Sequence, residues 1–395
     1  MQLISQNPTD EDFIQDPYKF YKNFVSTDGL YYWNEYNMPA VFDTAGQELL
    51  FKDKRFGREK LKNQSNNHET HLKAFYHVES NSMLELEPPK HTRLRGLVLR
   101  AFTTRKINTI QPEIAALSYK LLDDLKSNNV DILKEFATQL PVIVIARLLG
   151  VPETMAQDLL SWSNDMVMMY QARRTKELEI KANSSTKEFV SFMEKYIEEK
   201  RYKPEDDLIS HLIAAEQAGE KLSKDELIST CILLLNAGHE ATVHTLGNGI
   251  KAILEHGKDR NYLSPKYINS TVEEILRYDP PLHMFTRYAY EDVIFRNHKF
   301  KCGDQVALVI GAAGRDERIW SSPNKFDPFR QIKKNLSFGS GIHFCVGAPL
   351  ARLELVTALP IIFKKFPNIK LLDQPIYSNL YHFHGLQKLN VSLRN

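Results

Sequence analysis

The spacing of hydrophobic residues predicts a mainly helical chain. Apolar side chains recur with a helical period from residue 91 to about residue 254. Prolines and polar clusters interrupt this pattern at 151–152, at 183–185 and near 203–204, where we expect the helices to break. The pattern therefore predicts a series of helices across the middle of the chain.

The longest predicted helix can be bounded from its end signals. Ser223 and Glu226 have the spacing of a capping box, and Gly257 is a suitable stop. The residues between them are apolar almost all round, which is typical of a helix buried on most sides. Gly238 lies inside this helix and costs about 1 kcal/mol relative to alanine, so we expect a packing or functional reason for it.

Shorter elements flank these helices. Residues 30–42 are rich in Tyr, Trp and Val and predict a hairpin, and short strands fit residues 288–309. Between residues 55 and 83 the chain is polar and irregular, which predicts a long loop. A helix is expected over 270–278, and a last helix from just after Gly347 to about residue 366. The predicted architecture is mainly α with small β-sheets, in one large domain.

The composition narrows the class of protein. The chain has 395 residues with 51 Lys+Arg against 49 Asp+Glu, and this net charge of +2 argues against a nucleic-acid binder. There is no run of about 20 apolar residues and no signal-peptide pattern at the N-terminus, so we expect a cytoplasmic protein that does not enter a membrane. The three cysteines, Cys231, Cys302 and Cys345, are too widely spaced for a disulfide framework, which fits a reducing compartment.

One cysteine lies in a glycine-rich segment. Residues 338–347 read FGSGIHFCVG, and Cys345 comes directly before the predicted last helix. The positive end of a helix favours a thiolate, which can act as a nucleophile or bind a metal, and His343 could donate to an anion. A buried structural cysteine is the alternative for the residue alone. A phosphate-binding loop is disfavoured because neither G-K-[ST] nor G-x-G-x-x-G is present.

The segment resembles the haem-binding signature of the cytochrome P-450 family, F-G-x-G-x-H/R-x-C-x-G. Every defined position of that pattern is met, by Phe338, Gly339, Gly341, His343, Cys345 and Gly347. Further motifs occur in the family's order, and the chain is most similar to the soluble bacterial class. The resemblance implies a single-domain cytochrome P-450 fold over residues 1–395, with haem between the long central helix and the cysteine-bearing loop.

The resemblance also implies roles for individual residues. Cys345 would be the thiolate ligand of the iron of haem b, an arrangement that favours cleavage of the O–O bond of dioxygen. The haem propionates would be bound by basic side chains, namely His91, Arg95, Arg287 and His343. Other haem contacts would come from Phe338, Gly339 and Gly347 in the loop and from Ala237 and Gly238 in the long helix. Glu274, Arg277 and Arg330 match the family's buried ion-pair network, which we assign to the fold.

The chain departs from the family in the oxygen-activation motif, which is commonly A/G-G-x-D/E-T-T/S. Here it runs from Ala237 to Thr242, and Ala241 replaces the first threonine. Thr242 lies about 100° further round the helix, so it does not occupy the same place. Dioxygen needs two protons before its O–O bond breaks, so we expect Glu240 to feed protons through water while a substrate hydroxyl replaces the missing alcohol. The alternative is that Ala241 is tolerated because a chain of water suffices.

Two other functions are kept open. His239 and Glu240 begin a sequence similar to the zinc hydrolase motif H-E-x-x-H, but the second histidine, His244, is at i+5 rather than i+4. The other alternative is a haem-thiolate protein that does not insert oxygen, such as a sensor, an isomerase or a dehydratase.

The resemblance further implies a substrate pocket and partners. Candidate pocket residues are Met169, Leu234, His283, Met284, Phe285 and His384. We expect a monomer that hydroxylates or demethylates an apolar small organic substrate with O₂ as co-substrate. Electrons would come from NAD(P)H through a ferredoxin or flavodoxin and its reductase, docking on the cysteine side. Candidate docking residues are Arg93, Arg100, Arg105, Lys106 and Arg352, which would steer an acidic partner.

Overall fold

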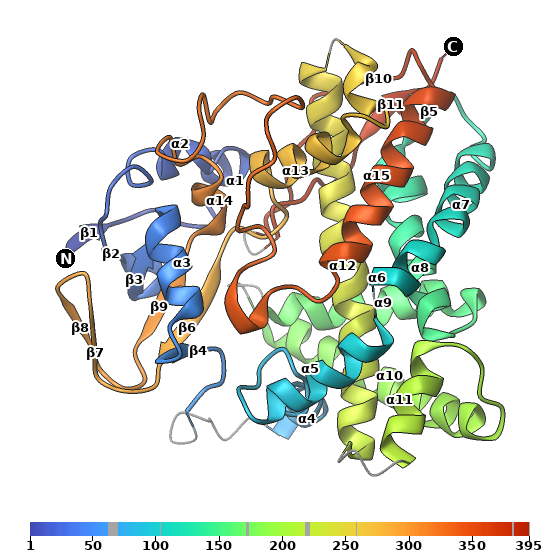
Figure 1. Cartoon of the computed structure of the whole chain (residues 1–395), viewed down its shortest axis with the longest axis horizontal. Coiled ribbons are helices and arrows are strands. Elements are labelled where there is room, and N and C mark those ends of the chain that lie inside the picture. Colours follow the sequence, from blue (N-terminus) through green and yellow to red (C-terminus); the bar gives the residue numbers. More distant parts are fainter. Residues whose placement is uncertain are drawn as a thin grey trace. The chain divides into compact units, whose positions relative to one another are not determined.

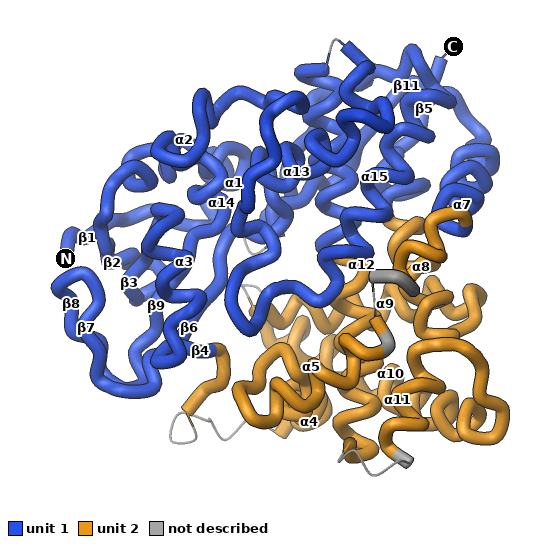
Figure 2. The backbone as a smooth tube through the Cα atoms, viewed as in Figure 1, with its two compact units in different colours: residues 1–57, 113–137, 241–395 blue, residues 58–112, 138–240 orange. Residues whose placement is uncertain are grey.

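The computed structural model describes residues 1–61, 70–102, 104–170, 174–217, 222–257, 259–380 and 383–394. It divides into two compact units (Figure 2). Unit 1 contains residues 1–57, 113–137 and 241–395, and unit 2 contains residues 58–112 and 138–240. The chain passes from unit 2 to unit 1 between Glu240 and Ala241, inside one helix.

Unit 1 is built around a six-stranded mixed sheet with the strand order β1-β2-β3-β9-β6-β4. The strands are β1 (Gln2–Ile4), β2 (Tyr31–Trp33), β3 (Met38–Val41), β4 (Phe56–Gly57), β6 (Phe285–Ala289) and β9 (Gln305–Leu308). β2 and β3 pair antiparallel, with Tyr31 opposite Ala40, which confirms the predicted hairpin. β3 then pairs in parallel with β9, so that Ala40 lies opposite Ala307.

Both faces of this sheet are buried. Side chains alternate between the faces of a strand, and in β9 this sends Ala307 to one face and Val306 and Leu308 to the other. Ala307 joins an aromatic cluster with Tyr21 of α2 (Tyr18–Tyr21), and Leu308 joins a second cluster that includes residues of α3 (Thr44–Lys52). Figure 1 shows α1 (Glu11–Gln15), α2 and α3 beside the sheet.

The remaining elements of unit 1 are mostly helical. α7 (Gln111–Asp123), which begins in unit 2, precedes β5 (Asn129–Asp131), and a π-helical turn follows at Leu133–Ala137. β5 forms a three-stranded sheet with β10 (Lys370–Leu371) and β11 (Asn390–Ser392). The other elements are β7 (Val293–Phe295), β8 (His298–Phe300), α13 (Ile268–Tyr278), α14 (Ile310–Ala313), the 3₁₀ turn η8 (Gly341–His343) and α15 (Ala348–Lys365). The positions of α13 and α15 confirm both predicted helices.

The described part of unit 2 is helical. Its helices are α4 (Lys73–Ser80), α5 (Lys90–Ala101), α6 (Thr104–Thr109), α8 (Gln139–Leu149), α9 (Ala156–Val167), α10 (Lys176–Tyr202) and α11 (Leu208–Gln217), with 3₁₀ turns at Thr70–Leu72, Glu153–Met155 and Met168–Tyr170. The N-terminal half of α12 (Lys224–His256) completes the unit. Among the described helices, none has the length and apolar content needed to cross a bilayer.

The predicted start of α12 is confirmed in atomic detail. The Ser223 amide donates to Glu226 Oε2 at 3.0 Å, and the Glu226 amide donates to Ser223 Oγ at 3.2 Å. These two bonds satisfy N–H groups that have no partner inside a helix. The helix runs to His256 without a break (Figure 1).

The expected loop over residues 55–83 and the expected helix break at 183–185 were both wrong, and Asn183 joins the two segments. The segment 55–83 contains α4 rather than loop alone, and α10 continues through 183–185. The Asn183 side chain accepts hydrogen bonds from the amides of Ala74 and Phe75 at 2.9 and 3.1 Å, in the first turn of α4. Because tertiary contacts satisfy the buried polar side chain, α10 is not interrupted there.

The expected ion-pair network behind the cysteine segment is confirmed. Arg277 donates to both carboxylate oxygens of Glu274 at 2.7 Å, and each side chain is only 1% exposed. Arg330 reaches Glu274 Oε2 at 3.1 Å. Arg277 also donates to the carbonyls of Gly314 and Pro323, so the buried charges are fully hydrogen-bonded.

Candidate haem-thiolate site

The cysteine segment of unit 1 forms a tight loop before α15. The Cys345 amide donates to the Phe338 carbonyl at 3.0 Å, and the Phe344 amide donates to the Gly341 carbonyl at 3.1 Å. Cys345 is half-buried and lies three residues before the start of α15. The loop thus holds a partly accessible sulfur at the positive end of a long helix, which favours the thiolate.

Two of the loop glycines have backbone conformations that other residues rarely adopt. Gly339 and Gly341 have φ values of +68° and +73°. A Cβ atom on Gly341 would also lie 2.3 Å from the carbonyl oxygen of Phe51 in α3. Gly341 is therefore required both for the turn and for its contact with α3.

The predicted basic residues lie in both units. In unit 1, Arg287 of β6 is 3% exposed, with its guanidinium 5.0 Å from the centre of the Phe51 ring, and His343 is half-buried in η8. In unit 2, His91 and Arg95 lie one turn apart in α5, where His91 is 2% exposed and Arg95 is half-buried. The permanent positive charge of Arg287 in a buried position is suited to an anionic ligand.

The middle of α12 contains the oxygen-activation motif. Ala237 is exposed, whereas Leu234, His239 and Thr242 are buried around it on the same helix. A Cβ atom on Gly238 would lie 2.7 Å from Ile145 Cγ1 of α8, which is the packing reason expected for this glycine. Ala237 is therefore an exposed small residue between buried positions of α12.

The helix around Ala241 contains a side-chain hydrogen bond to its own backbone. Thr245 Oγ1 donates to the Ala241 carbonyl at 2.7 Å. Thr242 is 5% exposed, and the Glu240 side chain retains 17% exposure. Of the three predicted catalytic positions, Glu240 therefore offers a polar group that is still partly accessible.

The zinc-hydrolase alternative receives no support from the geometry. His239 is 1% exposed, and its Nδ1 lies 2.8 Å from the Leu235 carbonyl, to which it donates. The His244 ring packs against Phe383 with ring centres 5.7 Å apart. Neither histidine belongs to a three-residue set of potential metal ligands within the described parts of the chain.

The apolar pocket candidates lie in protein interiors. In unit 2, Met169 and Leu234 are each 5% exposed. In unit 1, Met284 belongs to the aromatic cluster beneath the sheet, and Phe285 packs edge-on against Phe51. Their role in substrate binding stays a prediction.

A polar pair lies at the end of α9 in unit 2. Tyr170 donates to the two carboxylate oxygens of Glu79 at 3.0 and 2.9 Å. Burial, and to a smaller extent the nearby Glu85 carboxylate, raise the pKa of Glu79 to about 8, although the hydrogen bond from Tyr170 opposes this rise. A largely neutral carboxyl group is thus hydrogen-bonded to Tyr170, the residue that follows the pocket candidate Met169.

The two polar pocket candidates, His283 and His384, form a buried network in unit 1. Asp279 accepts hydrogen bonds from Tyr18 at 2.9 Å, from Tyr377 at 2.5 Å and from His384 Nδ1 at 2.9 Å. His384 Nε2 lies 3.2 Å from the Ile14 carbonyl. Because both ring nitrogens of His384 face acceptors, we assign this ring as the doubly protonated cation.

The charge of this network is balanced internally. Burial alone would raise the pKa of Asp279, but His384 opposes this with its charge and hydrogen bond and holds that pKa below the usual range. Burial lowers the pKa of His283 well below its ordinary value, and the neighbouring His384 lowers it further. The network therefore consists of an Asp279–His384 ion pair and a neutral His283 beside it.

This network does not have the geometry of a metal site. Asp279, His283 and His384 place potential ligand atoms within 4.8 Å of one another. However, the two imidazoles lie face to face at a tilt, with ring centres 4.4 Å apart and planes at 32°, whereas a metal ion lies in the plane of each ring that binds it. His283 is also engaged by Tyr21 and Tyr18, at 3.0 and 3.4 Å. The sequence alone does not predict that His283 and His384 belong to a structural network, because the residues they contact lie far apart in the chain.

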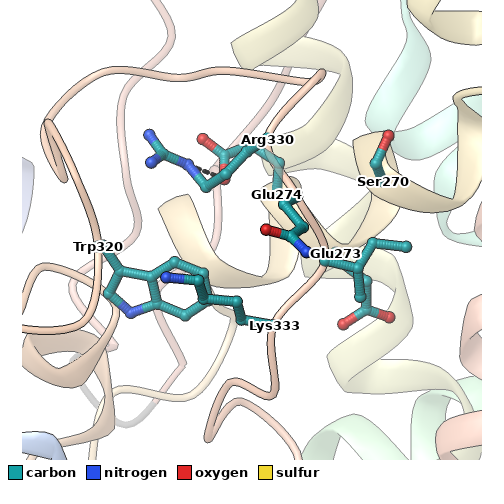
Figure 3. A pocket seen from close by; sticks show the side chains of 8 residues that line it. Ser270, Glu273, Glu274, Trp320, Arg330 and Lys333 are labelled. Atoms are coloured by element: carbon teal, nitrogen blue, oxygen red, sulfur yellow. Dashed lines mark hydrogen bonds and ion pairs between the residues drawn. The ribbon is translucent and has the colours of Figure 1, made fainter.

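A shallow surface pocket of unit 1 lies beside the Glu274 network (Figure 3). It is lined by Ser270, Glu273, Glu274, Trp320, Arg330, Gln331, Ile332 and Lys333. Its volume is about 190 Å³ including space open to solvent. Charged side chains that already form ion pairs make up much of its wall, so it is a poor site for an apolar substrate.

The residues present fit a haem group. The thiol of Cys345 lies in a glycine loop at a helix N-terminus, and unit 1 also contains the buried Arg287 and the half-buried His343. A soft sulfur ligand together with cationic groups suits an iron porphyrin with two carboxylates. The fold and the site together define the class of haem-thiolate proteins.

Comparison with known proteins identifies the family. The cytochrome P450 family model matches residues 53–258 and 258–375. The polyketide biosynthesis cytochrome P450 PksS of Bacillus subtilis is 42% identical over 321 residues, 80% of this chain and 78% of that protein. The biotin biosynthesis cytochrome P450 of the same species is 32% identical over 395 residues, 98% and 99% of the two chains. The chain belongs to the cytochrome P450 family and is a monooxygenase.

The solved structures agree with this assignment. The crystal structure of P450BioI in complex with an acyl carrier protein carrying hexadec-9Z-enoic acid has a TM-score of 0.91 and 32% sequence identity. It covers 97% of this chain, and this chain covers 99% of it. The predicted cytochrome P-450 fold, with its haem cofactor and O₂ as co-substrate, is confirmed at the level of the family.

We predict that the Asp279 network stabilises the fold in a pH-dependent way. Asp279→Asn removes the carboxylate and leaves the His384 cation buried, so the free energy of unfolding should fall by about 3–5 kcal/mol at pH 7. The folded pKa of Asp279 lies below its unfolded value of about 3.9, so this contribution is present above that value and is lost as the pH falls through the folded pKa. Urea unfolding at neutral and acidic pH measures both effects.

The exposed Asp373 provides the control for this prediction. Asp373 accepts a hydrogen bond from Asn390 at 2.7 Å but is exposed, so Asp373→Asn should change stability by less than about 1 kcal/mol. A difference between Asp279→Asn and the wild type that stays constant across the acidic range would contradict the assigned ion pair.

Proposed function

We propose that this P450 inserts one oxygen atom from O₂ into an apolar organic substrate, by hydroxylation or oxidative demethylation, with Cys345 as the thiolate ligand of its haem. The single observation that supports this is the half-buried Cys345 in its glycine loop before α15. Held by a thiolate, the haem supplies the oxygen-activating chemistry. The loop residues Phe338, Gly339 and Gly347 shape the backbone around that sulfur.

The basic residues of both units are proposed to bind the haem carboxylates. Arg287 and His343 belong to unit 1, and His91 and Arg95 belong to unit 2. Arg287 also donates to the Thr286 carbonyl, and its permanent positive charge in a buried position is suited to a carboxylate. Ala237 and Gly238 are proposed to lie against the haem from α12.

We predict that replacing Cys345 abolishes thiolate ligation. In the wild type, the reduced, CO-bound haem should show the strongly red-shifted Soret band that a thiolate produces. Cys345→Ser should lose this band, because a hydroxyl group is not a thiolate donor. Cys302→Ser is the matched control, since Cys302 is exposed on the β8–β9 turn, and it should keep the band. A red-shifted band that survives in Cys345→Ser would overturn the ligand assignment.

The surroundings of Cys231 and Cys302 are those of ordinary structural cysteines. Burial raises the pKa of Cys231 to about 12, so its thiol stays neutral. Cys302 donates to the Tyr290 carbonyl at 3.2 Å.

The substrate class follows from the apolar pocket candidates and from the relatives. The candidates in unit 1, Met284 and Phe285, and those in unit 2, Met169 and Leu234, are apolar, and methionine adapts to substrates of irregular shape. The names of the relatives refer to polyketide and biotin biosynthesis, and P450BioI binds a carrier-linked fatty acyl chain. We therefore propose an extended apolar acyl or polyketide-like substrate with a polar handle.

Proton delivery is proposed to use a hydroxyl group of the substrate. Ala241 has no hydroxyl group, Thr242 is buried, and Thr245 donates its hydrogen to the Ala241 carbonyl. Glu240 is the partly accessible acid of the motif and is proposed to relay protons through water. A hydroxyl group on the substrate completes the relay that a threonine provides in most family members.

We predict that Ala241→Thr does not improve coupling on the true substrate. The measured quantity is product formed per reduced nicotinamide consumed. An analogue lacking the substrate hydroxyl should couple poorly in the wild type, and Ala241→Thr should restore its coupling. Ala241→Val has the shape of threonine without the hydroxyl and should not restore it. A large gain from Ala241→Thr with the intact substrate would contradict substrate-assisted delivery.

Electrons are proposed to reach the haem from an acidic ferredoxin or flavodoxin that docks beside η8. Ile342 and Leu49 are 47% and 62% exposed, and η8 packs on the end of α3 that carries Leu49. Lys52 and Lys334 flank them, with side chains 54% and 56% exposed. Both lysines also lie within ion-pair distance of Glu48, at 3.5 and 3.9 Å, which leaves this surface a net charge of +1. An apolar centre with a net positive charge beside it suits an acidic partner.

Two of the arginines predicted for docking form ion pairs within the protein. Arg93 is paired with Glu226 at 2.6 Å, and Arg352 is paired with Glu273. The side chains of Arg105 and Lys106 lie outside the described residues, and Arg100 is exposed at the end of α5.

We predict that Lys334→Gln weakens reduction by an acidic ferredoxin several-fold at low salt, and that the difference shrinks as salt is added. Stopped-flow reduction measures it. Reduction by dithionite should be unchanged, and Lys370→Gln, on an exposed position of β10, is the matched control. Equal salt dependence of the wild type and Lys334→Gln would exclude this docking surface.

A further inference from the structure

The backbone at Cys345 depends on the position of Phe338. The Phe338 carbonyl accepts the Cys345 amide at 3.0 Å, and one residue later the Gly339 amide donates to the Leu336 carbonyl at 2.7 Å. These bonds close the loop on itself. Whatever fixes Phe338 therefore also fixes the residue that carries the sulfur.

A single carboxylate joins the two ends of this loop. Glu273 of α13 accepts hydrogen bonds from Asn335 Nδ2 at 3.1 Å and from Arg352 Nε and Nη2 at 2.5 and 3.3 Å. Asn335 precedes the loop and Arg352 follows it in α15. Figure 3 shows the Glu273 side chain pointing away from the Glu274–Arg330 pair, although the two glutamates are adjacent in sequence.

The same arginine covers the aromatic ring of the loop. The guanidinium carbon of Arg352 lies 4.6 Å from the centre of the Phe338 ring, which is the geometry of a cation–π contact. Glu273 orients the planar guanidinium through two of its nitrogens, and an ammonium group could not reproduce that contact. The contacts form a continuous series from Asn335 through Glu273, Arg352 and Phe338 to Cys345.

We propose that Glu273 and Arg352 are positioning residues for the Cys345 thiolate. Their pair fixes Phe338 from outside the loop, and Arg352 places a lasting positive charge over a residue hydrogen-bonded to Cys345. A positive charge favours a nearby thiolate, and the effect is moderate here because the Arg352 side chain is 35% exposed. This inference rests on the proposal that Cys345 is the haem ligand.

The test separates the geometry of the pair from its charge. Arg352→Gln and Glu273→Gln should each lose the red-shifted band of the reduced, CO-bound haem about two- to fivefold faster than the wild type in mild denaturant. Arg352→Gln should also shift the reduction potential of the haem to a more negative value, because a positive charge is removed. Arg352→Lys keeps the charge but not the planar contact, so the band should be lost faster while the potential stays near that of the wild type.

A matched control comes from unit 2. Arg147 Nε lies 2.8 Å from Glu153 Oε1, and the two side chains are 30% and 45% exposed. Glu153→Gln removes a similar arginine–glutamate pair and should leave the band and the potential unchanged. None of these measurements needs a substrate or a protein redox partner, so they do not depend on the proposed substrate or docking surface.

The outcomes distinguish this inference from the one on which it rests. If the wild type lacks the red-shifted band, the ligand assignment of Cys345 fails. If the wild type shows the band but Arg352→Gln and Glu273→Gln match it in both band lifetime and potential, the positioning role is wrong. A lower melting temperature in the two variants with an unchanged potential and band lifetime would show a merely structural pair and would also overturn the inference.

Discussion

Two adjacent carboxylates on α13 support the segment that presents Cys345. Glu274 is buried and binds Arg277 and Arg330, and it also accepts the Asp327 amide at 2.7 Å. Glu273 binds the two ends of the cysteine loop. Because each glutamate leaves the helix in its own direction, one turn of α13 holds both the chain that leads into the loop and the helix that leaves it. The half-buried Cys345 lies in the segment between these two supports.

The sequence predicts correctly those elements that depend on contacts between residues close together in the chain. The capping box at Ser223 and the glycine loop before α15 depend on residues within a few positions of one another, and the predicted bounds of α12 and α15 agree with the structure. The Asp279 network could not be predicted in this way. Tyr18 and His384 reach Asp279 across 261 and 105 positions of the chain, and no local pattern indicates such contacts. The uninterrupted course of α10 could not be predicted for the same reason. The polar side chain of Asn183 is satisfied by an amide of α4, which lies far away in the sequence.

Family resemblance and physical structure contribute different parts of the site. The resemblance predicted Cys345 and the basic residues, and the structure supplies their burial, backbone conformations and hydrogen bonds. The structure also shows that His283 and His384 have ring nitrogens bonded to protein groups. They therefore hold segments of unit 1 together, and their role in substrate binding stays a prediction. The bridge between Leu282 and Phe383 is one such segment contact.

The two glutamates of α13 differ in how they respond to their surroundings. The Glu274–Arg277 pair is 1% exposed, so a loss of either partner leaves an uncompensated charge in a medium of low polarity. The Glu273–Arg352 pair is partly exposed, and water screens its charges, so its energy is smaller and depends on what lies at the surface. Glu274 thus supports the fold, and its neighbour Glu273 belongs to the pair whose charge can act on the thiolate. The buried pair makes the fold stable, and the exposed pair is the one through which charge at the surface can influence the thiolate.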